Sequence, residues 1–209
     1  MTLEAGLAHG LAALAVPRNA DVEHKLLDYL ALIQKWNRVY NLTAVREPEK
    51  MLTHHVLDSV AVAPHLVGRT VLDVGSGAGL PGIPLAIVLP HAQVTLLDSN
   101  QKKSAFQQQA VIELALNNVD VVHARVESWD TPRAFDTVVS RAFADIAELV
   151  SAAGRLCAPG GVLAAMKGAY PKEELAQVPA SYSVQRVIPL NVPGLGAERH
   201  LVLMQASYA

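Results

Sequence analysis

The chain has 209 residues, of which 51% are hydrophobic and 17% charged, so it can bury a sizeable core and wholesale disorder is not expected. A formal net charge of -2 argues against a protein that coats nucleic acid without specificity, although it is compatible with a local basic patch. Cys157 is the only cysteine, which excludes a disulfide framework and fits a reducing compartment. Because no apolar run reaches the roughly 20 residues that span a bilayer, we expect a cytoplasmic protein.

The N-terminal part of the chain is predicted to be helical. Residues 1–18 have a weak pattern, which fits a short helix or a loose tail. Over residues 21–40, apolar side chains recur at three- and four-residue spacing, as on one face of a helix, and Asn19 or Asp21 can cap it. A second helix is expected over residues 48–64, because a proline at position 48 suits a first helical turn.

After Gly68, short apolar runs alternate with longer segments. The first five runs are separated by helix-length or long connections, which is typical of βαβ units and of a parallel sheet covered on both faces. The last two follow each other across a loop rich in proline and glycine and are predicted to form an antiparallel pair at one edge. The seven candidate strands are residues 70–74, 93–97, 119–123, 135–140, 161–167, 183–189 and 200–205.

These elements predict an α/β fold, a seven-stranded doubly wound sheet preceded by two or three helices. We divide the chain into an N-terminal helical segment, residues 1–66, and a sheet-containing domain, residues 67–209.

A glycine-rich loop follows the first predicted strand and opens a helix. It reads Asp73-Val74-Gly75-Ser76-Gly77-Ala78-Gly79-Leu80-Pro81-Gly82. Glycines at alternate positions let a backbone turn tightly and approach a ligand, because no Cβ stands in the way. The N-terminus of the following helix can then face a carboxylate or a phosphate.

Two nucleotide-binding interpretations compete for this loop. Gly77, Gly79 and Gly82 satisfy the dinucleotide fingerprint G-x-G-x-x-G, which is a weak signal by itself. The run from Asp73 to Gly79 resembles the first motif of class I methyltransferases, in which the acidic side chain helps to hold the ammonium group of methionine. Asp98, at the end of the second predicted strand, can accept hydrogen bonds from a ribose in either case.

The C-terminal half favours the methyltransferase. Residues 156–163 resemble the helix–Pro-Gly-Gly–strand turn that precedes the fifth strand of that fold, and the edge pair is similar to its reversed last strand. The implied cofactor is S-adenosylmethionine. An oxidoreductase is a distant alternative, since no Tyr-x-x-x-Lys constellation is present.

A narrower resemblance covers nearly the whole chain, from about residue 21 to residue 205. The ordered set of motifs is similar to the 16S ribosomal RNA guanine-N7 methyltransferases, also called the glucose-inhibited division protein B family. This resemblance implies methyl transfer to N7 of a guanine in 16S rRNA, with the 30S subunit or an assembly intermediate as partner. The motifs are residues 35–44, 55–59, 73–84, 96–103, 140–143 and 166–168.

The resemblance also implies where the cofactor binds. Glycine-loop residues would surround the methionine end, Asp98 the ribose, and the two residues after the third strand the adenine. The expected cofactor-binding residues are Asp73, Gly75, Gly77, Gly79, Leu80, Asp98, Val126, Glu127 and Arg141.

The implied chemistry needs no general base, because N7 of guanine has a free lone pair and no proton; we therefore expect no catalytic residue, only positioning. No metal site is expected either, since His54 and His55 have no further ligands at a suitable spacing. A basic rim near the carboxyl ends of the strands is a candidate for contacts with rRNA phosphates. Its members are Lys102, Lys103, Arg125, Arg141, Lys167 and Arg199.

Two functional alternatives remain open. One is a methyltransferase that acts on a small molecule or a protein, which would show activity on such substrates. The other is a non-catalytic module that binds the cofactor and transfers nothing.

Overall fold

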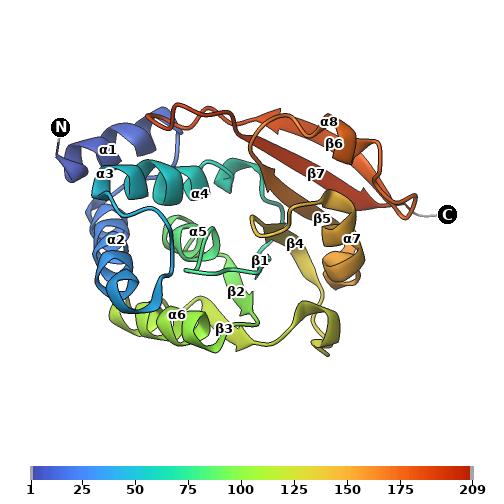
Figure 1. The fold of residues 1–209 in the computed structure, drawn as a ribbon, viewed down its shortest axis with the longest axis horizontal. Coiled ribbons are helices and arrows are strands. Elements are labelled where there is room, and N and C mark those ends of the chain that lie inside the picture. Colours follow the sequence, from blue (N-terminus) through green and yellow to red (C-terminus); the bar gives the residue numbers. More distant parts are fainter. Residues whose placement is uncertain (1, 208–209) are drawn as a thin grey trace.

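A mixed sheet crosses the centre of the molecule (Figure 1). The structure is a computed structural model and describes residues 2–207. The strands are β1 (Thr70–Val74), β2 (Gln93–Asp98), β3 (Val119–His123), β4 (Phe135–Ser140), β5 (Cys157–Lys167), β6 (Tyr182–Pro189) and β7 (His200–Ala206).

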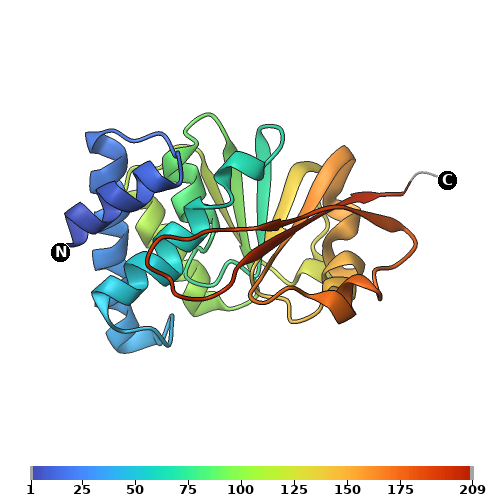
Figure 2. The same cartoon turned by 90° about the horizontal axis from the view of Figure 1, so that it is seen from above.

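The strand order is β3-β2-β1-β4-β5-β7-β6. β3, β2, β1, β4 and β5 pair in parallel, whereas β7 is antiparallel to both of its neighbours. β7 therefore lies inside the sheet and β6 forms its edge (Figure 2). The predicted parallel sheet with an antiparallel pair at one edge is confirmed.

The helices are α1 (Leu3–Ala13), α2 (Ala20–Tyr40), α3 (Pro48–Met51), α4 (Asp58–Val60), α5 (Gly82–Val88), α6 (Gln101–Glu113), α7 (Ile146–Ala153) and α8 (Lys172–Leu175). Shorter turns are the π-helical η1 (Leu52–Leu57) and the 3-10 turns η2 (Ala63–His65), η3 (Val126–Ser128) and η4 (Gly154–Leu156).

The N-terminal segment is helical, as predicted. The region left open as a short helix or a tail contains α1, and α2 is capped by Asn19, whose side chain accepts a hydrogen bond from the Val22 N–H at 2.9 Å. Residues 48–60 run through α3, η1 and α4 without a break, so the second expected helix contains a π-helical turn in its middle. Such turns are rare and often occur at functional sites.

The strands place alternate side chains on opposite faces of the sheet, as their two-residue period requires. Val71 and Leu96 pack on one face, together with α1, α2, α5 and α6. Leu72 and Leu97 pack on the other face, which α7 covers. The N-terminal helices therefore belong to the core of one sheet face, beside α5 and α6 (Figure 1).

Leu7 of α1 and Leu26 of α2 are fully buried in the same hydrophobic cluster as the sheet residues Val94 and Val139. The two expected parts of the chain, residues 1–66 and 67–209, thus share one core. We propose that the boundary between residues 66 and 67 divides the sequence only, because the N-terminal segment has no hydrophobic core of its own. Within residues 2–207, no helix is long and apolar enough to cross a membrane.

Candidate functional site

The carboxyl ends of the parallel strands bring the predicted site residues to one edge of the sheet. In such sheets, ligands bind where neighbouring connections diverge at that edge. Here the glycine loop follows β1, Asp98 ends β2, residues 124–127 follow β3, and Arg141 follows β4.

The glycine loop has a conformation that requires glycine. Gly75, Gly77 and Gly79 have φ values of +70°, +59° and +83°, in the left-handed region that side chains with a Cβ rarely adopt. A Cβ on Gly75 would also meet the Cβ of Ala142 at 2.6 Å. The backbone of the loop therefore approaches the connection after β4 more closely than any other residue type would permit.

Neighbouring helices hold the glycine loop from behind. The Gln107 amide of α6 donates to the Gly77 carbonyl at 2.8 Å and to the Ser76 hydroxyl at 2.9 Å. The buried Tyr29 hydroxyl of α2 donates to the Ala78 carbonyl. Because α2 lies in the N-terminal segment, that segment takes part in shaping the loop.

The two acidic residues at the strand ends have different surroundings. Asp98 accepts hydrogen bonds from the Gly77 N–H at 2.7 Å and the Asn100 N–H at 2.8 Å, and its carboxylate lines a cavity. Asp73 is fully buried, and one of its oxygens accepts a hydrogen bond from the Gly82 N–H at 2.7 Å. Burial raises the pKa of Asp73 to about 7, although the Gly82 N–H acts in the opposite direction.

Asp73 thus lies behind the loop, joining the end of β1 to the start of α5, and is not among the residues that line the cleft. Its expected contact with a methionine ammonium group stays a prediction.

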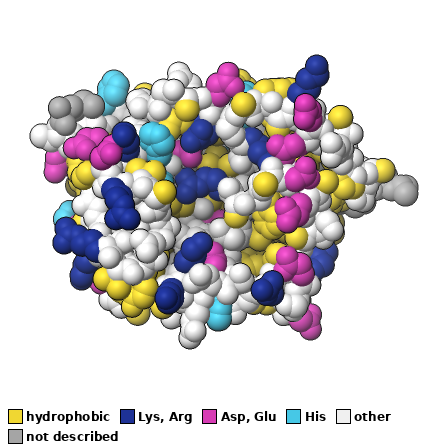
Figure 3. Space-filling view, viewed as in Figure 1, with side chains coloured by type: hydrophobic (Ala, Val, Ile, Leu, Met, Phe, Trp, Pro, Cys, Tyr) yellow, Lys and Arg dark blue, Asp and Glu magenta, His cyan; other side chains and the backbone are white. Residues whose placement is uncertain are grey.

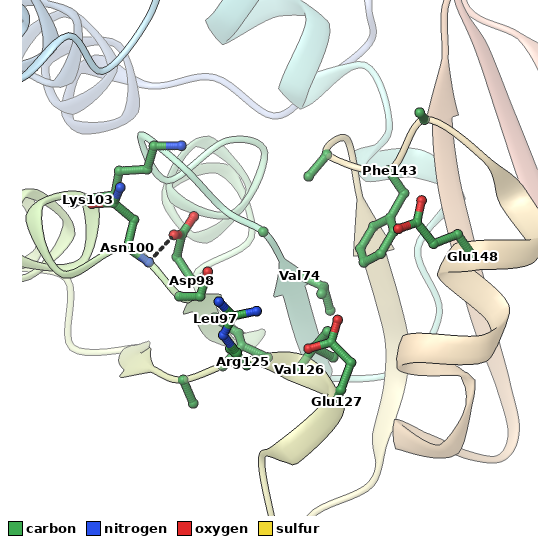
Figure 4. Close-up of a pocket in the computed structure, with 15 residues that line it drawn as sticks. Val74, Leu97, Asp98, Asn100, Lys103, Arg125, Val126, Glu127, Phe143 and Glu148 are labelled. Atoms are coloured by element: carbon green, nitrogen blue, oxygen red, sulfur yellow. Dashed lines mark hydrogen bonds between the residues drawn. The ribbon is translucent and has the colours of Figure 1, made fainter.

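The first cavity, of about 540 Å³, opens between the ends of β1, β2, β3 and β4 (Figure 4). Asp98 and Asn100 form one side, Val126 and Glu127 lie below, and Phe143 faces them from the connection after β4 (Figure 4). Such a volume suits a small organic ligand. The carbonyl of Val126 is fixed by Arg155, whose Nη2 donates to it at 2.8 Å.

Two further cavities continue the first one. A cavity of about 170 Å³ shares Gly75 and Ala142 with the first and also contacts Leu80. A cavity of about 370 Å³ shares Arg141 with that small cavity. The three cavities are therefore neighbours around the glycine loop, and we refer to them together as the cleft. We call them the first, the connecting and the second cavity, and name them so below.

The second cavity is built around a buried carboxylate. Asp58 has 1% of its side chain exposed; its Oδ1 accepts from Arg199 Nε at 2.9 Å and its Oδ2 from Arg141 Nη1 at 3.4 Å. Arg141 Nη1 also donates to the His54 carbonyl at 3.1 Å. The turn formed by η1 and α4 therefore delivers both the carboxylate and a carbonyl to the two guanidinium groups.

His55 is a second polar group buried beside this cavity. Its Nε2 lies 2.8 Å from the Thr43 hydroxyl. Burial, followed by the charge of Arg141, lowers the pKa of His55 to about 4, so the imidazole is neutral at physiological pH.

The six expected RNA-binding residues fall into three groups. Lys103 and Arg125 line the first cavity. Arg141, Lys167 and Arg199 line the second cavity, and Lys102 is exposed outside both.

Lys167 differs from the others because its ammonium is already occupied. It lies 2.7 Å from the Ala144 carbonyl, 3.2 Å from the Phe143 carbonyl and 2.6 Å from a Glu174 carboxylate oxygen, with 9% of the side chain exposed. This geometry ties the connection after β4 to α8, and leaves little of Lys167 for a phosphate.

Sequence reasoning missed several residues of the cleft. Asn100, Phe143 and Glu148 line the first cavity, and Asp58 organises the second. Asp58 stands in the motif of residues 55–59, but the sequence gives no sign of its two arginine partners, which lie 83 and 141 residues further along the chain.

Two other kinds of chemistry, metal binding and nucleophilic attack by a cysteine, depend on how the His, Cys, Asp and Glu side chains are placed. Among the described residues 2–207, no group of three or more His, Cys, Asp or Glu side chains is placed to hold a metal ion. Burial raises the pKa of the Cys157 thiol to about 11, which disfavours the nucleophilic thiolate.

Solved structures with a similar fold include several methyltransferases. The O-methyltransferase TomG from Streptomyces achromogenes, in complex with SAM, has a TM-score of 0.60 and 17% sequence identity, over 95% of this chain and 94% of that one. TrmN from Thermus thermophilus has a TM-score of 0.56 and 16% identity, over 82% of this chain and 53% of that one. At these identities the likeness concerns the fold.

The strand order with its reversed β7, the glycine loop after β1 and the acid at the end of β2 define a class I S-adenosylmethionine-dependent methyltransferase. The family described as rRNA small subunit methyltransferase G matches residues 22–202. The chain belongs to this family, and the resemblance seen in the sequence is confirmed.

Relatives named ribosomal RNA small subunit methyltransferase G match almost end to end. The one from Nitrosospira multiformis is 55% identical over 206 residues, covering 95% of each chain. The one from Laribacter hongkongensis is 54% identical over 202 residues, covering 97% of this chain and 98% of that one.

Proposed function

We propose that this protein transfers a methyl group from S-adenosylmethionine to N7 of a guanine in 16S rRNA. The observation that carries the proposal is the row of three adjacent cavities, in which the connecting cavity beside the glycine loop shares lining residues with the nucleoside-sized first cavity and with the cationic second one. Membership of the rRNA small subunit methyltransferase G family supports the RNA substrate.

The residues of the first cavity fit the cofactor. Asp98 retains acceptor capacity for ribose hydroxyls after its two backbone hydrogen bonds, since an ionised carboxylate has about four lone-pair sites. Val126 and Glu127 are assigned to the adenine, and Gly75 with Leu80 to the methionine end beside the connecting cavity. When bound, the cofactor supplies an electrophilic methyl group on a sulfonium.

The task of the chain in this reaction is positioning. Because N7 carries a lone pair and no proton, no side chain has to remove a proton. The glycine loop, held by Tyr29 and Gln107, fixes one side of the path between the cavities. Arg141, bound to Asp58 and to the His54 carbonyl, fixes the other side.

The charge distribution around the cleft suits an RNA substrate despite the net charge of -2. In Figure 3, Lys and Arg side chains lie over the N-terminal helices and around the centre of the face, with a group of acidic side chains at the upper left, and further acidic side chains follow the right side. We propose that the rRNA backbone crosses the basic part of this face, with the N-terminal helices forming part of the RNA surface. The 30S subunit or its assembly intermediate is the proposed partner, and the cytoplasm the proposed location.

The test is methyl transfer from labelled S-adenosylmethionine to 30S subunits from a strain that lacks the gene, with the labelled nucleoside identified. We expect 7-methylguanosine in 16S rRNA, and its loss in Asp98→Ala together with loss of cofactor binding by calorimetry. Asp120→Asn is the matched control, because Asp120 is an exposed acid that forms an ion pair with Arg133 near the start of β3, away from the cleft.

Other outcomes would replace this proposal. Transfer to free metabolites or to a protein, without label in the RNA, would identify a different methyltransferase. Tight cofactor binding without transfer to 30S subunits, naked 16S rRNA or precursor particles would indicate a non-catalytic module.

A further inference from the structure

We propose that the second cavity receives the target base, and that Arg141 and Arg199, both oriented by Asp58, select a purine with an oxygen at C6. This inference rests on the proposed function and names the element that distinguishes guanine from adenine. Asp58 acts as a positioning residue, and the two guanidinium groups make the contacts.

The position of the second cavity fits an acceptor base. Arg141 lines both the connecting cavity, beside Gly75 and Leu80, and the second cavity. A base placed there would therefore lie beside the connecting cavity and the methionine end of the cofactor site, with Arg141 in contact with both. The cavity of about 370 Å³ has room for a purine ring, and Val45 and Met166 supply apolar surface for its faces.

The hydrogen-bond donors of the two arginines are only partly used by the protein. A guanidinium has five N–H groups. Arg141 makes its contacts to Asp58 and His54 through Nη1, so its Nε and Nη2 have no partner among residues 2–207. Arg199 uses Nε for Asp58 and Nη1 for the Glu198 carbonyl, and its Nη2 is likewise without one.

Asp58 explains why two like charges stand together at this place. Each of its oxygens takes one guanidinium, and the carboxylate itself is buried. Each guanidinium also donates to a backbone carbonyl, that of His54 for Arg141 and that of Glu198 for Arg199, so two contacts restrict each side chain. The carboxylate also offsets part of their mutual repulsion.

Other polar groups around the cavity do not supply the same donors. The Lys167 ammonium is occupied by Glu174 and by two carbonyls. His55 is neutral; its Nε2 faces Thr43, and its buried Nδ1 has no hydrogen-bond partner among the described residues. His54 Nδ1 lies 2.8 Å from the Thr53 hydroxyl and 3.1 Å from the Lys50 carbonyl. The N–H groups of the two arginines are therefore the cationic donors left free at this wall among the described residues.

Donors of this kind distinguish the two purines. Guanine has an acceptor oxygen at C6 next to the acceptor N7, whereas adenine carries a donor amino group at C6. An arginine N–H bound to O6 leaves N7 free for methylation. An amino group at C6 would instead face a cationic donor, and a buried donor would lose its partner.

The experiment uses 30S subunits reconstituted with 16S rRNA that carries guanosine, inosine or 2,6-diaminopurine riboside at the methylated position. Inosine keeps the oxygen at C6 and lacks the 2-amino group, whereas diaminopurine keeps the 2-amino group and replaces the oxygen. We expect kcat/KM of the wild-type protein on inosine to stay within about 10-fold of guanosine. On diaminopurine we expect it to fall by about 100-fold or more.

The variants are Asp58→Asn and Arg199→Gln, with Asp120→Asn and Arg133→Gln as controls from the exposed Asp–Arg pair outside the cleft. We expect each test variant to lower kcat/KM on guanosine by about 10- to 100-fold and to shrink the guanosine-to-diaminopurine ratio by about 10-fold. The Kd for S-adenosylmethionine should stay within about twofold in Arg199→Gln, since Arg199 lines neither the first nor the connecting cavity. Arg199→Lys keeps the positive charge but lacks the planar guanidinium. It tests the same contact if Asp58→Asn fails to fold.

Two outcomes would overturn the base pocket while leaving the proposed function intact. One is equal methylation of diaminopurine and guanosine by the wild-type protein. The other is an unchanged guanosine-to-diaminopurine ratio in both Asp58→Asn and Arg199→Gln. If the wild-type protein yields no 7-methylguanosine from the guanosine substrate, the proposed function itself fails, and the base pocket with it.

Discussion

Two buried side chains, His55 and Asp73, make opposite contributions to the pH dependence of stability. The pKa of His55 is lowered from 6.5 to about 4, so between these values the unfolded chain binds a proton that the folded chain does not. Its contribution is therefore lost as the pH falls from about 6.5 to about 4. The pKa of Asp73 is raised from 3.8 to about 7, so its contribution is lost as the pH rises through that interval.

The contribution of His55 can be isolated with His55→Gln. Between pH 7 and pH 5, we expect the free energy of unfolding of the wild-type protein to fall by roughly 2 kcal/mol more than that of the variant. Urea unfolding at both pH values measures this difference, and Asp73 contributes equally to both proteins. Identical pH dependence in the two proteins would show that His55 is protonated in the folded state as readily as in water.

Lys102 and Lys103 are neighbours in sequence with different surroundings. Lys102 is exposed at the first turn of α6, whereas Lys103 lines the first cavity. We expect Lys102→Glu to lower methylation of 30S subunits by about 10-fold at moderate salt with unchanged cofactor affinity, because it removes a phosphate contact. Lys103→Glu should also weaken cofactor binding. A filter assay measures methylation, and calorimetry measures the Kd for S-adenosylmethionine. Unchanged methylation by Lys102→Glu would show that Lys102 is not part of the RNA-binding surface.

Contacts between helices and loops set the shape of the cofactor site. The glycine loop is bound from α6 by Gln107 and from α2 by Tyr29, whose ring is fully buried. Burial raises the pKa of Tyr29 well above its usual value of 10, so its hydroxyl stays a donor at physiological pH. An N-terminal helix thus acts on the cofactor site without touching the cofactor.

Tyr29→Phe tests this connection. The change removes one hydroxyl and leaves the Ala78 carbonyl without that partner, so we expect a loss of about 1–2 kcal/mol in stability. We also expect a several-fold increase in the Kd for S-adenosylmethionine, measured by calorimetry. Tyr170→Phe is the control, because Tyr170 is 54% exposed. A destabilised variant with unchanged affinity would mean that the loop keeps its shape without Tyr29.

Strands such as β1, β4 and β7 were predictable because each is a short, largely buried apolar run, whereas β6 at the edge is mostly exposed. Helix α1 could not be predicted with the same certainty, because Gly6 and Gly10 lie on its buried face. A Cβ on Gly10 would meet the Leu57 side chain at 2.5 Å. Small residues that permit close approach leave no apolar period to detect. The π-helical turn η1 likewise has no sequence signal of its own.

The residues of the site also differ in how far the sequence predicts them. Asp98 was predictable because its partner, the Gly77 N–H, belongs to a recognisable motif. Asp58 was not, because Arg141 and Arg199 lie 83 and 141 residues further along the chain. Only the fold brings these three residues together, and the same holds for the contact of Lys167 with Glu174.

For the chain as a whole, the shared core makes the N-terminal segment a structural necessity. Leu26, Tyr29 and Ile33 of α2 are fully buried in the hydrophobic cluster that includes α5 and α6, against which α2 packs. Without residues 1–66, the apolar surface of those two helices would face water.

We therefore expect a fragment of residues 67–209 to lack a cooperative thermal transition and to aggregate, although it contains the glycine loop and every strand. Circular dichroism and light scattering, with the full chain as control, measure both properties. A cooperative transition together with cofactor binding by the fragment would show that the sheet domain folds independently.

The position of β7 has a consequence for the order of events during synthesis. β7 follows β6 in the chain, yet it lies between β5 and β6 and pairs with both. When β6 leaves the ribosome, the strand that will join it to the sheet has not yet been made. β5 therefore keeps an open edge, and β6 stays outside the sheet, until β7 has been made and pairs with both. A nascent chain that stalls in this interval exposes strand edges to its neighbours, and this is the stage at which we expect chaperone contact to matter most.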